Sequence, residues 1–458
     1  MKIYKFLSRT LPLVLLVGTF FYFSACEIDE QVDPNGPSLE GIESNATIGD
    51  LNNVVSGIES NMRNRLGTYY DGVGVMGREW FRFSGSDPRF TSDLLGKGAA
   101  VLDNNTFYTT NPFAERYRTV RNCNILINAI GNTTEPLTQE QKNGYLGFAK
   151  TIMAYQLLLV LNQQYSCGIR VDVADVDNLG PFVSYDDALN AINGMLNEGE
   201  QLLSSAGDSF VFGLSSGFSG FDTPVSFNLF NRALAARVNL YRSDADATLQ
   251  NLADSFFELA GDSATLYKGV YHVFSTGGGG DVSNEMYYPL NSAAGGNLRA
   301  AHPSYISDAE VGDLRLWKVG MRADTAFQDG LQSNYDFYLY RSLSDPIPLI
   351  RNEELVLIYA EAQNMKGNAS ASVFAINLIR NVAGLPDYSG GTSETELRNE
   401  ILKQRRYSLY GEGHRWIDMR RYDLLNTLPI DRADDDVWKN FPRPATENEP
   451  CPAVSANG

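Results

Sequence analysis

Helical spacing of apolar residues runs through most of the chain and predicts a mainly α-helical fold. The clearest helix start follows Thr138, where Thr138 and Gln141 form a capping box. The apolar stretch of this predicted helix reaches about residue 165. The other predicted helices cover residues 47–66, 112–130, 184–203, 226–242, 245–260, 352–365, 370–382, 393–410 and 414–421. Residues 67–108, 204–225 and 262–350 are rich in Gly and polar or aromatic residues, and they are expected to form long loops.

Several predicted helices occur in pairs of similar length. Residues 234–258 and 358–382 each contain alanines, a polar turn and a second periodic helix, and residues 149–165 with 186–203 resemble a third pair. Small alanines let paired helices approach closely, as in tetratricopeptide-type repeats. We therefore expect a mainly α fold, with a tetratricopeptide-like scaffold of helical pairs and long loop-rich insertions. An irregular helical bundle is the alternative.

The start of the chain has the composition of a targeting segment. Residues 1–25 combine basic residues with an apolar run from Leu11 to Phe23, which predicts a signal peptide. Ala25-Cys26 closes this run at the spacing of a lipoprotein signal, in which Cys26 would carry lipid. An ordinary secretory signal is the alternative. The acidic segment 26–46 is predicted to be a tether.

Residues 47–458 are expected to form a single domain. We divide it into an N-terminal part (47–261), a loop-rich part (262–350) and a C-terminal part (351–458). The chain has a formal net charge of −18. Loss of residues 1–25 would make this about −21, and such an acidic surface repels nucleic acid, so no nucleic-acid partner is expected.

Cysteine usage gives little guidance. If Cys26 is lipidated, Cys123, Cys167 and Cys451 remain, and three cysteines cannot all pair within the chain. Cys123 lies in an apolar helical segment and is predicted to be a buried thiol.

Patterns that resemble catalytic or metal-binding motifs lack the context that these motifs need. Residues 72–77 match G-x-G-x-x-G, but no buried strand precedes them, so a flexible loop is expected. The histidines are widely separated, and the acidic residues 172–177 lack the bidentate Glu of a calcium loop. No esterase nucleophile motif occurs. We expect no enzymatic activity, metal or cofactor; a hydrolase with an undetected carboxylate pair is the alternative.

An aromatic cluster in the segment 67–108 is the strongest indication of a binding site. Sugar rings have an apolar C–H face and a hydroxyl rim, which suit aromatic rings beside charged hydrogen-bonding groups. About half of these rings are expected to be core, and Trp80 is the first choice for an exposed platform. Tyr287 and Tyr288 are predicted to form a second wall, and Trp317 is expected to be structural. The cluster comprises Tyr69, Tyr70, Trp80, Phe81, Phe83 and Phe90, with Arg82, Asp87 and Arg89 among them.

Segments of the C-terminal half resemble the signature of the SusD/RagB family. They are residues 348–362 (PLIRNEELVLIYAEA), 376–386 (INLIRNVAGLP) and 401–422 (ILKQRRYSLYGEGHRWIDMRRY). Residues 441–450 resemble the Pro-rich segment that closes family members. Gln404 and Tyr407-Ser408 depart from the family pattern. The positions that agree with it are Gly411, Glu412, Gly413, Arg415, Trp416, Asp418 and Arg421.

This resemblance implies a tetratricopeptide-like fold and a noncatalytic lipoprotein that binds glycans for nutrient uptake. It implies a location on the outer membrane, facing the cell exterior and anchored through lipid on Cys26. It also implies a partner, a SusC-like TonB-dependent transporter that receives the captured oligosaccharide or polysaccharide. Peptide capture, as in RagB-like proteins, is the alternative. Binding residues differ across the family, so the resemblance assigns none of them.

The last block of the resemblance is expected to be structural. Arg415, Trp416, Asp418 and Arg421 would form a buried network of arginines and carboxylate around an indole, which would hold the last helices on the scaffold.

Overall fold

The structure is a computed structural model that describes residues 39–277, 281–293 and 296–457. The predicted signal peptide and Cys26 lie outside these residues. Helix α2 (Leu39–Asn45) packs against α5 (Phe107–Asn132), and it falls within the range predicted to be a tether. Residues 39–45 of the predicted tether are therefore helical.

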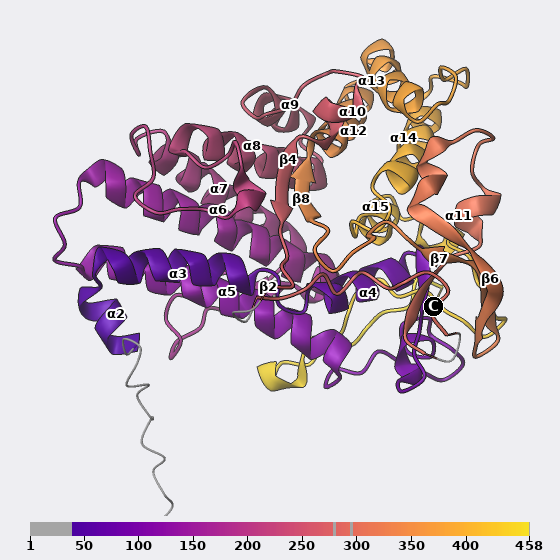
Figure 1. Cartoon of the computed structure of the whole chain (residues 1–458), viewed down its shortest axis with the longest axis horizontal. Helices are drawn as coiled ribbons and strands as arrows, with labels where there is room; N and C mark the ends of the chain where they lie inside the picture. Colours follow the sequence, from indigo (N-terminus) through magenta and orange to yellow (C-terminus); the bar gives the residue numbers. More distant parts are fainter. Residues whose placement is uncertain (1–38, 278–280, 294–295, 458) are drawn as a thin grey trace, which may run out of the picture.

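A stack of long helices forms one half of the molecule. Figure 1 shows α3, α5, α6, α7 and α8 side by side, and neighbours in this series contact one another. The predicted pairs α6–α7, α8–α9 and α12–α13 are each in contact, which confirms the tetratricopeptide-like scaffold. The bounds of these helices are α3 (Ile48–Asn61), α6 (Gln139–Gln164), α7 (Tyr185–Leu203), α8 (Pro224–Tyr241), α9 (Ala245–Ala253), α12 (Asn352–Met365) and α13 (Ala369–Val382).

Helix α6 is the centre of this stack. Its predicted capping box is present, because the Thr138 hydroxyl accepts from the Gln141 N–H and the Gln141 side chain accepts from the Thr138 N–H. Its composition and length would suit a membrane span, but 89% of its apolar window is buried within the protein. We interpret it as a core helix that α5, α7 and α8 cover.

The predicted loop 67–108 begins with a buried helix, α4 (Leu66–Met76), which contradicts the expectation for the glycine motif at residues 72–77. Its glycines allow close packing. A Cβ on Gly74 would lie 2.1 Å from the Trp80 ring, and a Cβ on Gly72 would lie 2.9 Å from Phe441. The motif therefore provides space for aromatic side chains in the core.

The predicted loop 262–350 also contains regular structure that local spacing did not indicate. A four-stranded antiparallel sheet has the order β1-β5-β7-β6, and β4 pairs with β8. β1 aligns Trp80 with Ala301 and Phe83 with Leu298, a pairing between distant parts of the chain. The strands are β1 (Trp80–Phe83), β4 (Gly269–His272), β5 (Leu298–Ala301), β6 (Val319–Gln328), β7 (Leu331–Phe337) and β8 (Ile347–Arg351).

The remaining elements are shorter or belong to the C-terminal part. They are α10 (Ser263–Tyr267), α11 (Ser304–Ser307), α14 (Glu394–Ser408), α15 (Arg415–Arg421) and the two-stranded sheet of β2 (Ile169–Arg170) and β3 (Phe182–Val183). Gly411 and Gly413 connect α14 to α15 with φ of +81° and +80°, values that favour glycine.

A buried ionic network joins α12, α14 and α15. Arg405 donates to Asp418 at 2.7 Å, and Arg421 donates to Glu361 at 2.9 Å and to Asp418 at 3.1 Å. Burial alone would raise the pKa of Asp418, but Arg405 and Arg421 lower it below its usual value. The Trp416 N–H donates to the Trp438 carbonyl at 2.8 Å. These contacts hold the last helices against the scaffold.

A disulfide joins Cys167, at the end of α6, to Cys451 in the C-terminal tail. The two cysteines are 284 residues apart in the sequence. Cys123 is buried and unpaired, as predicted. The sequence did not indicate which cysteines pair, because a disulfide requires proximity in space rather than a local pattern.

Candidate ligand-binding site

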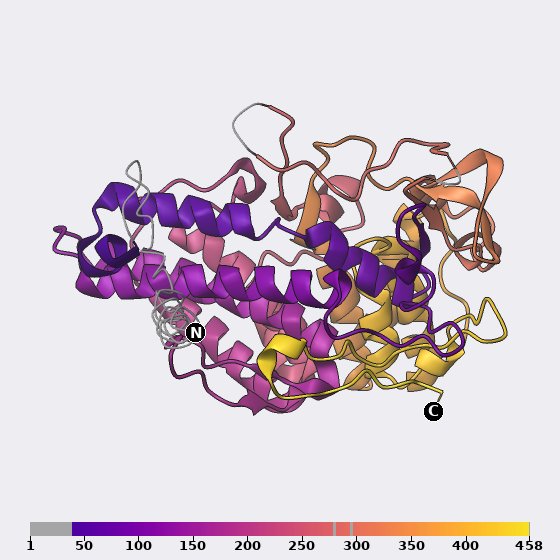
Figure 2. The same cartoon turned by 90° about the horizontal axis from the view of Figure 1, so that it is seen from below.

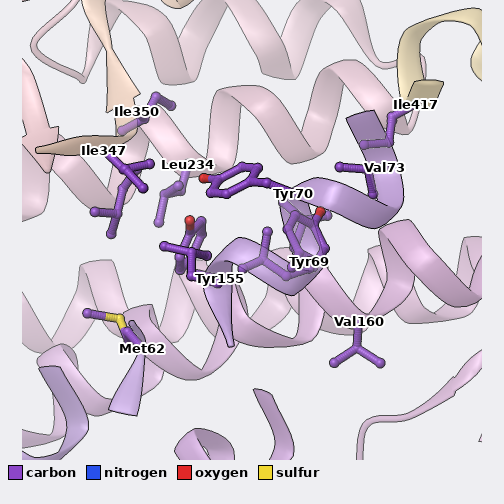
Figure 3. Packing of buried hydrophobic residues seen from close by; sticks show 14 of the residues in the cluster. Met62, Tyr69, Tyr70, Val73, Tyr155, Val160, Leu234, Ile347, Ile350 and Ile417 are labelled. Carbon is purple, nitrogen blue, oxygen red and sulfur yellow. The ribbon is translucent and has the colours of Figure 1, made fainter. Parts of the chain in front are cut away.

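The aromatic cluster predicted to be a platform is mostly core. Trp80, Phe81 and Phe83 are 0%, 2% and 0% exposed in β1, and Tyr69 and Tyr70 are 2% and 3% exposed in α4. Figure 3 shows both tyrosines within the apolar core, among residues of distant elements such as Leu234 and Ile350. The prediction of an exposed platform at Trp80 is therefore wrong: α4 and β1 are covered on both faces, so their rings are buried.

Trp80 finds inside the protein the hydrogen-bond partner that its N–H needs. Its Nε1 donates to Asp71 Oδ1 at 3.2 Å, and its ring packs on Phe337 with centroids 4.9 Å apart. A buried indole is tolerated where its N–H is paired. Asp71 lies on α4, directly beside the pocket described next.

Two members of the predicted cluster, Arg82 and Phe90, line a pocket together with the predicted second wall, Tyr287 and Tyr288. This tyrosine pocket has a volume of about 330 Å³. Both tyrosines are half-buried, whereas Phe90 is 9% exposed. The other lining residues are Gly67, Thr68, Asp71, Ser283, Asn284, Glu285, Arg299 and Leu343.

A buried cluster of charges forms the base of the tyrosine pocket. Asp71 accepts from Arg82 Nε at 3.2 Å, from Arg299 Nε at 2.6 Å and from Arg299 Nη2 at 2.8 Å. Such paired, hydrogen-bonded charges are stable in a buried position, whereas any one of them alone would not be. The guanidiniums of Arg82 and Arg299 therefore share the single carboxylate of Asp71.

The two arginines fix the position of Tyr288. Their guanidinium carbons lie 5.2 Å (Arg82) and 5.1 Å (Arg299) from the Tyr288 ring centroid, and Arg82 Nη2 donates to the Tyr288 hydroxyl at 2.9 Å. Cation–π contacts of this kind contribute about 0.5–2 kcal/mol each. Tyr288 is therefore a preorganised aromatic group, held on a rigid base although it belongs to a loop.

Several polar groups of the pocket remain open to a ligand. Glu285 uses Oε2 to accept the Gly67 N–H at 3.1 Å, which leaves its other oxygen as an acceptor. Within the described part of the chain, the side chains of Thr68, Ser283 and Tyr287 make no hydrogen bond. Aromatic rings beside hydroxyls and a carboxylate suit a ligand with apolar faces and many hydroxyl groups.

The remaining predicted site residues lie elsewhere. Arg89 Nη2 pairs with Asp87 at 2.7 Å on the surface, and neither residue lines the tyrosine pocket. This hydrogen bond lowers the pKa of Asp87. Among the described residues, no group of three or more His, Cys, Asp or Glu side chains could hold a metal ion.

Three residues that are central to the pocket were missed at the sequence level: Asp71, Glu285 and Arg299. Asp71 and Arg299 are 228 positions apart and meet only through the pairing of β1 with β5. An arginine in a short strand carries no local signal for such a contact.

Comparisons with known proteins agree with this architecture. Residues 333–451 match the model of the SusD family. A SusD-like protein of Formosa agariphila is 32% identical over 148 residues, and the match covers 29% of this chain and 29% of that relative. A SusD superfamily protein from Bacteroides vulgatus superposes with a TM-score of 0.68 at 17% identity, covering 88% of this chain and 97% of that one. Residues 333–451 therefore match the SusD family, and the chain as a whole has the SusD fold.

Other solved structures of this family share the fold. A laminarin-binding SusD-like protein superposes with a TM-score of 0.64 at 16% identity, over 89% of this chain and 98% of that one. NanU of Bacteroides fragilis superposes with a TM-score of 0.65 at 14% identity, over 92% and 99% of the two chains.

The SusD family match and the tyrosine pocket cover different parts of the molecule. Of the residues that line the pocket, only Leu343 falls within the matched range 333–451. The matched range instead contains Arg405, Asp418 and Arg421 of the ionic network. The range that matches the SusD family therefore includes the ionic network, and most of the tyrosine pocket lies outside this range.

Proposed function

We propose that this protein is a noncatalytic glycan-binding lipoprotein of the cell surface, which captures oligosaccharides or polysaccharides in the tyrosine pocket. The observation that carries the proposal is the position of Tyr288, a half-exposed ring held beside open hydroxyl and carboxylate groups by Arg82 and Arg299. The solved structure of a laminarin-binding SusD-like protein supports a carbohydrate ligand, as does the match of residues 333–451 to the SusD family.

The chemistry of the pocket favours sugars because it combines two kinds of contact. An aromatic face packs against the C–H groups of a pyranose ring, and the hydroxyls at the rim of that ring need donors and acceptors. Glu285 supplies an acceptor, and Thr68, Ser283 and Tyr287 supply hydroxyls that act as either. Arg82 and Arg299 are occupied by internal hydrogen bonds, so they position Tyr288 and leave recognition to these groups.

Binding is tested with purified wild-type protein and the variant Tyr288→Ala. Affinity electrophoresis against laminarin, starch, xylan and mannan, followed by calorimetry, is expected to show a retained glycan and an affinity loss of about tenfold, or about 1.4 kcal/mol, in the variant. Phe374→Ala is the matched control, because Phe374 is 55% exposed on α13, away from the pocket. Equal affinity of Tyr288→Ala and wild type would reject the pocket as the site.

The same samples distinguish the other classes of function. A response to peptides without any response to glycans would replace the proposal with peptide capture. Release of new reducing ends during prolonged incubation with a bound polysaccharide would show a hydrolase and contradict a purely binding role.

We also propose that lipid on Cys26 anchors the protein to the outer membrane and that a SusC-like TonB-dependent transporter receives the glycan. The sequence Ala25-Cys26 after an apolar run supports the anchor, and the match to the SusD family supports the transporter. Expression of Cys26→Ser is expected to move the protein from the membrane fraction to the soluble fraction. Co-purification of the wild type with a TonB-dependent transporter from the native membrane tests the partner.

A further inference from the structure

A second polar pocket lies next to the tyrosine pocket and has no role in the function proposed above. It has a volume of about 450 Å³ and is built by the C-terminal half of α3, the segment 213–218 and β4. Its hydrogen-bonding residues include Glu59, Arg63, Ser215, Tyr271, His272 and Asp281, and Leu214 and Phe218 add apolar surface. We call it the histidine pocket.

Charged side chains of both signs are held in defined positions in this pocket. Arg63 Nη1 lies 2.7 Å from Asp281 Oδ1 and donates to the Val273 carbonyl at 2.7 Å. Both carboxylate oxygens of Glu59 accept the Ser215 N–H at 3.2 Å. Burial raises the pKa of Glu59, although Ser215 and Arg63 oppose this shift. The pocket is thus a prearranged set of donors and acceptors, with more acidic than basic groups.

The unpaired side chain of His272 is a second indication, beside the charged groups, that this pocket binds a ligand. It is 3% exposed, and its Nε2 makes no hydrogen bond to any residue that the structure describes. Burial, together with Arg116 and Arg63, lowers the pKa of His272 well below its usual value, so the ring is neutral. A neutral imidazole carries one donor and one acceptor, and leaving either unpaired in a buried position costs free energy.

Two short stretches of chain supply residues to both pockets. The chain at the junction of α3 and α4 contributes Arg63, in the connection, to the histidine pocket and Gly67, in the first turn of α4, to the tyrosine pocket. Four residues of chain span at most about 14 Å. The loop after β4 likewise contributes Asp281 to one pocket and Ser283 to the other. The contacts Arg63–Asp281 and Gly67–Glu285 tie these segments together, and Figure 2 shows α3 and α4 one after the other, joined by a short connection.

We propose that the histidine pocket is a further subsite for the same ligand, so that one neutral glycan chain lies across both pockets. This inference rests on the proposed function. A chain that occupies the tyrosine pocket presents its next sugar units at high effective concentration to the adjoining pocket, so affinity rises with chain length. The excess of acidic groups over Arg63 repels an anionic glycan, and donors and acceptors side by side suit sugar hydroxyls.

The test changes the wall of the histidine pocket without touching the tyrosine pocket. Gly213 lines the histidine pocket, and a Cβ there meets no heavy atom within 4 Å, so Gly213→Trp adds an indole at the wall of the pocket at little cost to the fold. Gly131→Trp, on α5, is the matched control, because a Cβ at Gly131 is equally unobstructed and lies outside both pockets. Thermal unfolding checks that both variants are folded.

The probes are size-fractionated oligosaccharides prepared from whichever of laminarin, starch, xylan or mannan the wild type retains, with an alginate ladder as the acidic comparison. Wild type and Gly131→Trp are expected to gain affinity by about tenfold or more from the shortest to the longest oligosaccharides. Gly213→Trp is expected to bind the shortest ones normally and to lose this gain, whereas Tyr288→Ala weakens every length.

The outcomes separate the two proposals. If short glycans bind through Tyr288 but Gly213→Trp gains affinity with length like wild type, the second subsite is rejected and the proposed function stands. If alginate fragments bind better than the neutral ladders, the charge argument is rejected. If no glycan binds the wild type at all, both proposals fall together.

Discussion

The molecule has two groups of aromatic residues with similar neighbours in the sequence but different roles. One group lies on α4 and β1, and the other is the pair Tyr287 and Tyr288 in the loop 283–288. Tyr69 and Trp80 belong to regular elements that are covered on both faces, so their rings fill the core. Tyr287 and Tyr288 follow an irregular loop and remain half-exposed. Aromatic density alone does not identify a binding surface; a ring contributes to one where its backbone lies at the edge of the packed layers.

Asp71 connects the two regions. Its carboxylate accepts the Trp80 indole N–H from the core and the guanidiniums of Arg82 and Arg299 from the pocket. The orientation of Tyr288 therefore depends on core packing, since the same guanidiniums hold its ring. The core side of this comparison is tested by three substitutions in and next to α4 and β1, taken from the largest expected effect to the smallest.

The variant Trp80→Ala tests the core side of the comparison most strongly. Removal of a fully buried indole is expected to lower the free energy of unfolding by about 3–5 kcal/mol, measured by chemical denaturation. The control Trp317→Ala, at a site 41% exposed, is expected to change it much less, by about 0.5 kcal/mol. Similar losses in the two variants would contradict the assignment of Trp80 to the core.

Gly74→Ala tests whether α4 is packed as tightly as the structure shows. The added Cβ would lie 2.1 Å from the Trp80 ring, so we expect a loss of about 1–3 kcal/mol in the free energy of unfolding. Gly194→Ala is the matched control in α7, where a Cβ meets no heavy atom within 4 Å. There the greater helix propensity of alanine is expected to stabilise the protein by about 0.5–1 kcal/mol.

Glu79→Gln tests the polar residue that precedes β1. Glu79 is 3% exposed; Oε1 accepts the Gly411 N–H at 3.1 Å, and Oε2 has no partner among the described residues. Burial raises the pKa of Glu79 above its ordinary value of 4.5, so its contribution to stability is full below pH 4.5 and falls as the pH rises toward the folded-state pKa.

Replacement of Glu79 by Gln keeps the acceptor for Gly411 and removes the titration. The variant is therefore expected to exceed wild type in stability by about 1 kcal/mol at pH 8 and to show no such gain at pH 4, in paired denaturation series. A gain of equal size at both pH values would indicate a packing effect instead.

The helical scaffold was predictable because its signals are local. The capping box at Thr138 and the alanine-containing pairs indicate α6 and the pairs α8–α9 and α12–α13 from the sequence alone. Helix α4 escaped prediction because its glycines indicated a loop. Its helical form depends on tertiary packing against Trp80 and Phe441, which overrides the weak helix propensity of glycine.

The candidate site was predictable only in part. Tyr288, Arg82 and Phe90 were chosen for their chemistry, and the structure brings them together in the tyrosine pocket. Trp80 was chosen on the same grounds and is core. Trp80 is buried because β1 pairs with β5, and the same pairing brings Arg299 to Asp71. Pairings between distant strands leave no pattern in a single sequence.

The bond between Cys167 and Cys451 has a practical consequence for limited proteolysis of this protein. A cut in any loop between these residues leaves two fragments that remain covalently joined and separate only under a reducing agent. Nicked molecules would therefore migrate as intact ones on non-reducing gels, and damage to a surface loop need not detach either half of the scaffold.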